Sequence, residues 1–133
     1  MDIHSKTEFE LNKRLAELMG LEVAEIDDTK CIGMTTAYHK LKPHTVWVSD
    51  GKSAWYQFCA TRSWEDIGPT ITELQIALIP VAHDGRVGTE CSELWFSHVF
   101  FDGGDEFRSD DVERPEHAAT IAAIVALSGT DNF

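Results

Sequence analysis

The sequence predicts an α+β fold, in which a small antiparallel sheet packs against helices at the N-terminal and C-terminal ends of the chain. Three observations favour this fold: an amphipathic helix pattern over residues 5–20, β-prone runs around turn signals in the middle, and an apolar helix pattern over residues 115–129. With 133 residues, 43% of them hydrophobic, the chain is long enough to bury a core. We therefore expect a single domain that spans residues 1–133.

The C-terminal helix pattern is the stretch around which the other elements are expected to pack. Pro115 is a favoured first helical residue, Gly129 is a helix stop, and the residues between them are apolar on nearly every face. Such a helix is either buried or membrane-spanning, and about 14 residues are too few to cross a bilayer. We expect it to be the central core helix of a soluble domain.

The first helix is predicted over residues 5–20. Thr7 and Glu10 have the spacing of a capping box, and Gly20 is a stop signal. Its apolar stripe should face the core and consists of Leu11, Leu15, Leu18 and Met19. Its opposite face should be exposed to water and carries Glu8, Asn12, Lys13 and Glu17. A short strand over residues 21–26 and a turn over residues 27–29 should follow.

A β-hairpin is predicted near the middle of the chain. Residues 46–48 and residues 54–58 are β-prone runs on either side of the pair Asp50-Gly51. An Asp-Gly pair favours a tight hairpin turn, because both central positions of that turn need positive φ.

A second helix is predicted to begin at Ser63. Ser63 would be its N-cap, with Asp66 completing a capping box. The alternative is that Gly68 and Pro69 delay the regular part of the helix to residues 70–73.

Two more strands are predicted over residues 75–82 and 93–101, as antiparallel neighbours joined through a turn at Asp84-Gly85. In the second of these strands, His98 should be a core histidine and not a ligand, because it shares a strand face with Leu94, Phe96 and Phe100. Residues 102–114 should then form a polar, acidic loop before the last helix.

The charge balance and the cysteines exclude several classes of protein. With 23 acidic and 11 basic residues, the formal net charge is -12, which opposes binding to nucleic acid or to anionic lipid. Cys31, Cys59 and Cys91 are odd in number and widely spaced, so we expect small buried side chains and neither disulfides nor a zinc site. No signal peptide and no membrane span is recognisable. A cytoplasmic location is expected.

Three segments, taken together and in this order, resemble the NinX-like proteins of tailed bacteriophages and prophages. They are residues 7–13, residues 64–73 and residues 114–121, and they carry a helix with a Glu-Leu-Asn-Lys core, a central Trp-Glu-Asp-Ile-Gly-Pro run and a Pro-Glu-His-Ala-Ala start to the last helix. The sequence departs from the family before the central tryptophan, at residues 58–63, and before the last helix, at residues 113–114. The resemblance implies a small phage accessory protein that acts inside a bacterium, and it brings no established activity.

The first candidate site is the predicted acidic loop. It could dock a partner with a basic surface through Asp102, Asp105, Glu106, Asp110, Asp111 and Glu113. The alternative is a solvated loop whose last acids favour the positive end of the following helix. A calcium site is not expected, because the spacing of an EF-hand loop is missing.

The second candidate site combines cations with aromatic rings in residues 36–62. It could stack a nucleotide-like molecule through Tyr38, Lys40, Trp47, Lys52 and Trp55. The alternative for the rings is core and cross-strand packing. The cations could instead pair with the acidic loop of a second copy, which would give a homodimer.

The sequence contains no pattern that points to catalysis. No Ser or Cys lies in a nucleophile motif, and no phosphate-binding or dinucleotide-binding glycine pattern is present, so no catalytic residue, cofactor or metal is assigned. The leading hypothesis is a non-enzymatic accessory protein that binds a host or phage protein with a basic surface, with counter-defence or host take-over as the setting. The alternative is a ligand-binding module or enzyme that uses the cationic aromatic patch. Direct binding to DNA is disfavoured by the charge.

Overall fold

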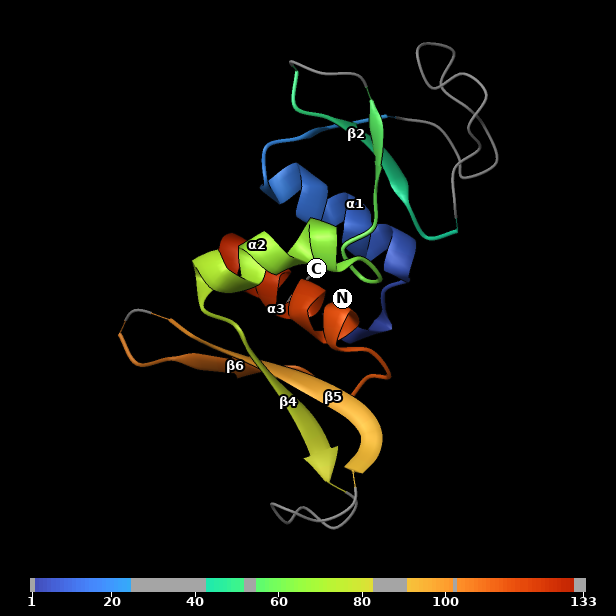
Figure 1. The fold of residues 1–133 in the computed structure, drawn as a ribbon. Coiled ribbons are helices and arrows are strands. Elements are labelled where there is room, and N and C mark those ends of the chain that lie inside the picture. Colours follow the sequence, from blue (N-terminus) through green and yellow to red (C-terminus); the bar gives the residue numbers. More distant parts are fainter. Residues whose placement is uncertain (1, 25–42, 52–54, 83–90, 102, 131–133) are drawn as a thin grey trace.

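The computed structural model describes residues 2–24, 43–51, 55–82, 91–101 and 103–130. Within these residues the fold is α+β, with three α-helices and two three-stranded antiparallel sheets. The predicted fold class is therefore confirmed, although the one expected sheet is two. In Figure 1 the helices form a layer between the sheets, with β1–β2–β3 on the side of α1 and β4–β5–β6 on the side of α3.

Helix α1 covers Glu8–Leu18 and is preceded by a 3-10 turn over Ile3–Ser5. The predicted capping box is confirmed, because the Glu10 amide donates to Thr7 Oγ1 at 3.2 Å and the Thr7 amide donates to Glu10 Oε1 at 3.1 Å. Gly20 follows the C-cap residue Met19, and its φ of 82° suits glycine. Leu11 and Leu15 are buried as predicted, whereas Met19, which was expected to face the core, is 41% exposed.

The first sheet consists of β1 (Glu22–Val23), β2 (Val46–Ser49) and β3 (Tyr56–Phe58). Strands β2 and β3 pair antiparallel, with Val46 opposite Phe58, which confirms the predicted hairpin. The predicted tight turn at Asp50-Gly51 is wrong, because Asp50 does not have the positive φ that this turn needs. The predicted strand over residues 21–26 is confirmed at β1, whereas residues 25–26, the turn over residues 27–29 and residues 52–54 lie outside the described residues.

Helix α2 covers Trp64–Leu74 without interruption, so the predicted delay to residue 70 is wrong. Pro69 lies inside the helix, where it removes the donor for the carbonyl of Glu65, and both residues are exposed, so that water can replace the lost bond. The predicted capping box is also wrong. The Ser63 side chain forms no capping bond, and the Asp66 carboxylate instead accepts the amide of Cys59 at 2.9 Å.

The second sheet consists of β4 (Ala77–Ala82), β5 (Cys91–Phe100) and β6 (Glu106–Arg108). The predicted antiparallel pairing of the first two strands is confirmed, and the turn at Asp84-Gly85 lies outside the described residues. The expectation of a plain loop before the last helix is wrong, because β6 pairs with β5 there. A strand of three residues is too short to show a recognisable alternation in the sequence.

Strand β5 faces the core with the opposite set of side chains from the predicted one. Ser97 and Val99 are buried, and the Ser97 hydroxyl donates to the carbonyl of Ala118 at 2.6 Å, whereas Phe100 is 67% exposed. His98 is therefore not a core histidine, as we expected, because its Nε2 lies 3.1 Å from Glu106 Oε2 on the outer face. The reason is that the last helix packs against the strand face that carries Ser97 and Val99, so this face is covered and the face with His98 and Phe100 is not.

Helix α3 covers Pro115–Ser128, is followed by Gly129 with φ of 78°, and is the core helix that the sequence predicts. Its eight consecutive residues from Ala118 to Val125 are all buried, against α1, α2 and the second sheet. Figure 1 shows it in the middle of the molecule. No helix in the described ranges is long and apolar enough to cross a membrane.

Candidate functional site

Five of the six predicted partner-binding residues lie on β6 or in the segments that flank it, and they are exposed. We call Asp105, Glu106, Asp110, Asp111 and Glu113 the acidic segment. The sixth predicted residue, Asp102, lies outside the described residues. Bases contact three of the five carboxylates: His98 at Glu106 (3.1 Å), Arg108 at Asp111 (3.5 Å) and His4 at Asp110 (3.6 Å). Acids remain in excess, so the segment is a negative surface.

An apolar surface adjoins the acidic segment on the outer face of the second sheet. Phe100 is 67% exposed directly opposite Glu106 in the strand pairing, and Ile79 on β4 is 37% exposed. Phe96, which is opposite Ile79 in the strand pairing, has the guanidinium of Arg108 4.0 Å above its ring centre, which is a cation–π contact. The face therefore combines large exposed apolar side chains with charges of both signs.

The predicted cationic aromatic patch is described only at its two tryptophans. Trp47 is 2% exposed, and its indole nitrogen has no hydrogen-bond partner within the described part of the chain. Trp55 is half-buried, whereas Tyr38, Lys40 and Lys52 lie outside the described residues. The burial of Trp47 agrees with packing between strands, and ligand binding by this patch stays a prediction.

A wide hollow of about 730 Å³ lies between the start of β2 and the start of α2. It is lined by Pro43, His44, Thr45, Gln57, Cys59, Arg62, Ser63, Glu65 and Asp66. Burial raises the pKa of Asp66, although the hydrogen bonds that it accepts act in the opposite direction. Cys59 is buried and free of any disulfide.

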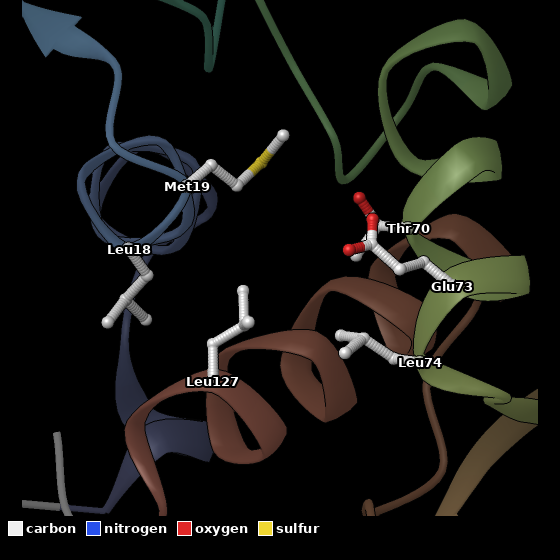
Figure 2. Close-up of a pocket in the computed structure, with 6 residues that line it drawn as sticks. All are labelled: Leu18, Met19, Thr70, Glu73, Leu74 and Leu127. Atoms are coloured by element: carbon white, nitrogen blue, oxygen red, sulfur yellow. The ribbon is translucent and has the colours of Figure 1, made fainter.

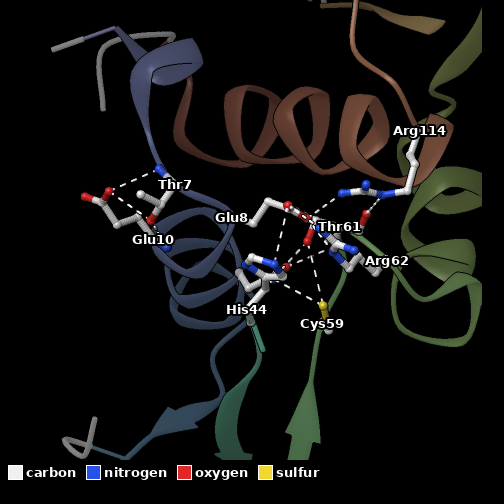
Figure 3. A network of polar contacts seen from close by, with 9 residues as sticks. Thr7, Glu8, Glu10, His44, Cys59, Thr61, Arg62 and Arg114 are labelled. Carbon is white, nitrogen blue, oxygen red and sulfur yellow. Dashed lines mark hydrogen bonds and ion pairs between the residues drawn. The ribbon is translucent and has the colours of Figure 1, made fainter. Parts of the chain in front are cut away.

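A network of polar contacts that the sequence analysis did not anticipate centres on Glu8. The Arg62 guanidinium donates to both oxygens of Glu8, at 3.0 and 2.9 Å, and Arg114 donates to Oε1 at 2.6 Å (Figure 3). Partial burial tends to raise the pKa of Glu8, but hydrogen bonds from Arg62 and Thr61, together with the charge and hydrogen bond of Arg114, lower it to about 2. Glu8 thus links α1 to the segment before α2 and to the start of α3.

Asn12 strengthens the same junction from inside the protein. Its amide nitrogen donates to the carbonyl of His44 at 2.8 Å and to Thr61 Oγ1 at 3.0 Å, and its oxygen accepts the Thr61 amide at 3.0 Å. Asn12 is fully buried, so its predicted exposure is wrong. The helix pattern places Asn12 on the polar face, and only the tertiary structure shows that residues near Thr61 cover that face.

The Glu8 network suits a structural role better than catalysis. Burial lowers the pKa of the nearby His117, so this imidazole tends to stay neutral, and a shallow hollow of about 320 Å³ lies beside it. The carboxylate of Glu8 is held by two arginines and is a poor base at neutral pH. Among the described residues, no group of three or more His, Cys, Asp or Glu side chains could hold a metal ion.

A second unexpected feature is a pocket of about 290 Å³ at the ends of the three helices. We call it the helix-end pocket, and it is lined by Leu18, Met19, Thr70, Glu73, Leu74 and Leu127. Figure 2 shows Met19 from α1, Glu73 and Leu74 from α2 and Leu127 from α3 converging on the same space. Three unrelated helix ends contribute to the pocket, so no local sequence pattern could have revealed it.

Comparisons with known proteins do not assign a family. No family model matches this sequence, and no curated protein matches it. A phage protein from Bacillus cereus, known from a crystal structure, is structurally similar, with a TM-score of 0.49 and 17% sequence identity over 93% of this chain and 90% of that chain. The NinX-like resemblance is not confirmed by these results, and a similarity of this degree assigns no function to the chain.

Proposed function

We propose that this protein is a non-enzymatic accessory protein that binds a partner with a basic surface through the acidic segment. The observation that carries the proposal is Phe100, which is 67% exposed on the sheet face beside the carboxylates of that segment. Aromatic anchors surrounded by a polar rim are typical of the energetically important part of protein interfaces. The proposed interface therefore has Phe100 at its centre and the acidic segment as its rim.

Charge gives the chemistry of the partner. The net charge of -12 and the excess of carboxylates near Phe100 attract a positively charged surface and accelerate its encounter. The same charges repel nucleic acid, so a nucleic-acid-binding protein is a more suitable partner than the nucleic acid itself. A row of carboxylates can occupy such a surface in place of phosphates.

The proposal also includes a biological setting. The sequence resemblance to NinX-like proteins supports a phage or prophage accessory protein that binds a host or phage protein in the bacterial cytoplasm. Inhibition of a host defence protein, by covering its nucleic-acid-binding surface, is the specific form of this hypothesis. A homodimer is a further possibility, and sizing of the pure protein tests it.

The first experiment is an affinity pull-down from bacterial lysate, with and without nuclease, followed by mass spectrometry. We expect one enriched basic protein whose capture resists nuclease. Capture that disappears with nuclease treatment would indicate an indirect association through nucleic acid and would contradict direct binding between the proteins.

The second experiment measures the affinity of that partner for charge variants. The quadruple variant D105N/E106Q/D110N/D111N should bind at least about tenfold more weakly, and raised salt should reduce wild-type affinity. The matched control E17Q/E22Q/D50N/E65Q neutralises four exposed acids elsewhere and should lose much less. Equal losses in the two variants would show that only the overall charge matters.

The Phe100→Ser variant tests the apolar part of the interface. Because the ring is mostly exposed, we expect little change in stability and a loss of about tenfold or more in affinity. If the Phe100→Ser variant keeps its affinity and the quadruple charge variant loses it, the interface consists of the acidic segment alone and does not include the outer face of the second sheet.

A second candidate function is the binding of a nucleotide-like small molecule. The hollow of about 730 Å³ near His44 and Gln57 favours this alternative. Its size is within the range typical of small-molecule sites. A thermal-shift screen with nucleotides tests this candidate, because a ligand that binds only the folded state raises the melting temperature. No shift with any nucleotide would remove it.

A further inference from the structure

The helix-end pocket lies where three helices terminate. Leu18 is the last residue of α1, Leu74 is the last residue of α2, and Leu127 is the residue before the last of α3. The carbonyls of Glu17, Ile71 and Val125 already accept backbone amides that follow each helix, so the partial negative charge at these ends comes from the helix dipole. Three negative helix ends therefore surround one space.

The amino acids near these ends do not neutralise that charge. No basic residue lies in the last turn of α1, α2 or α3, although cations are favoured at helix C-termini. The carboxylate of Glu73, which is exposed, adds a full negative charge, and Figure 2 shows it directed toward the pocket. Arg14 lies one turn before Leu18 and is not part of the lining.

The walls of the pocket are mostly apolar and accessible. Met19 is 41% exposed and Leu127 is 40% exposed, and Leu18 and Leu74 complete the apolar lining. Thr70 and Glu73 are the polar part. The volume of about 290 Å³ has room for one long side chain and little more.

We propose that the helix-end pocket binds a lysine side chain of a partner protein. The four methylene groups of lysine suit the leucine and methionine walls, and its ammonium group suits Glu73 and the carbonyl ends of the helices. Lysine fits better than arginine, because its ammonium is a compact charge, whereas the planar guanidinium of arginine needs a bidentate partner. This site involves other elements than the acidic segment and does not depend on it.

The test uses n-butylammonium, which reproduces the lysine side chain, and follows the methyl signals of Met19, Leu74 and Leu127 by NMR at constant ionic strength. Pentanoate and 1-butanol are matched probes with the same alkyl chain and a negative or neutral end. We expect shifts of these methyl signals with butylammonium, binding about fivefold to tenfold weaker with butanol, and none with pentanoate. Equal responses to all three probes would reduce the site to an unselective apolar hollow and overturn the proposal.

The variant Glu73→Gln separates the carboxylate from the helix ends. It should weaken butylammonium binding severalfold without abolishing it, whereas Glu65→Gln, at the other end of the same helix, should have no effect. Both side chains are exposed, so both variants should fold, and thermal unfolding checks this. The proposed geometry would be contradicted if Glu73→Gln bound butylammonium as tightly as the wild type. It would also be contradicted if Glu73→Gln and Glu65→Gln weakened the binding equally.

Discussion

At the scale of single residues, Glu8 and Asn12 are the polar side chains that join distant segments. Glu8 is a partly buried carboxylate shared by Arg62 and Arg114, and Asn12 is a fully buried amide bonded to His44 and Thr61. Both lie on the same face of α1. Their removal should therefore affect stability more than the removal of the exposed glutamates of α1.

We predict that Glu8 makes the protein sensitive to acid. Its pKa of about 2 in the folded state is below the value of 4.5 expected when the chain is unfolded, so its stabilising effect is complete above about pH 4.5 and is lost as the pH falls toward 2. Because the site is partly solvated, we expect Glu8→Gln to lower the free energy of unfolding at pH 7 by about 1–2 kcal/mol. Urea unfolding at pH 7 and at pH 3 measures both effects.

The control is Glu17→Gln, which removes an exposed carboxylate from the same helix. It should change stability by less than about 0.5 kcal/mol. If Glu8→Gln and the wild type lose stability equally between pH 7 and pH 3, the acid sensitivity does not arise from Glu8.

We predict that Asn12→Ala lowers the free energy of unfolding by about 3 kcal/mol. The substitution removes the partners of the Thr61 amide and the His44 carbonyl at a buried position and leaves a cavity. Chemical denaturation measures the loss. A cost below about 1 kcal/mol would mean that water replaces the amide and that the junction is less closed than it is in the structure.

At the scale of elements, the ends of the helices are defined by residues with positive φ. Gly20 and Gly129 have φ of 82° and 78° after α1 and α3, whereas α2 ends at Gln75 with φ of 55°. The Ile76 amide bonds to the Ile71 carbonyl at 3.0 Å, so the same kind of helix end forms without a glycine. Gln75 is therefore the strained position among the three.

We predict that Gln75→Gly raises the free energy of unfolding by about 0.5–1 kcal/mol, because glycine reaches positive φ without a steric penalty. The matched control is Gly129→Ala. An added Cβ there would contact nothing within 4 Å, so its expected loss of about 1 kcal/mol arises from φ alone. Thermal unfolding measures both variants. A decrease in stability for Gln75→Gly would show that the Gln75 side chain contributes contacts that outweigh the strain.

At the scale of the whole molecule, the two sheets are connected through the helical layer. The first sheet contacts α1, the second sheet contacts α3, and α1 and α3 pack against each other. The buried segment from Ala118 to Val125 is in the centre of this arrangement (Figure 1). We infer that neither sheet keeps its structure when α3 is displaced.

We predict that both sheets unfold in one transition. Fluorine-labelled tryptophan gives one signal for each of the four tryptophans, and single Trp→Phe variants assign those of Trp47 in the first sheet and Trp95 in the second. ¹⁹F NMR of the wild type in urea then follows both signals. The two midpoints should coincide, as expected of a single cooperative domain. Two separate midpoints would show that the chain consists of two units and would contradict the single domain over residues 1–133.

The predictions that succeeded depend on local patterns, and those that failed depend on contacts between distant segments. The Thr7 capping box, the antiparallel pairing of β2 with β3 and the core helix from Pro115 follow from neighbouring residues, and the structure confirms them. The predicted environments of His98 and Asn12 are wrong. Alternation along a strand or periodicity along a helix separates two faces, but it does not show which face another element covers. Strand β6 was missed because it is too short to have a pattern.

The candidate sites divide in the same way. The sequence by itself determined the net charge, the acidic segment and the three helices, because these follow from composition and from periodicity over a few residues. Only the tertiary structure decided that Phe100 lies exposed beside the acidic segment, that Glu8 holds Arg62 and Arg114, and that three helix ends surround one pocket. The physical reason is that burial and electrostatic surroundings are set by residues far apart in the chain, whose proximity no local pattern encodes.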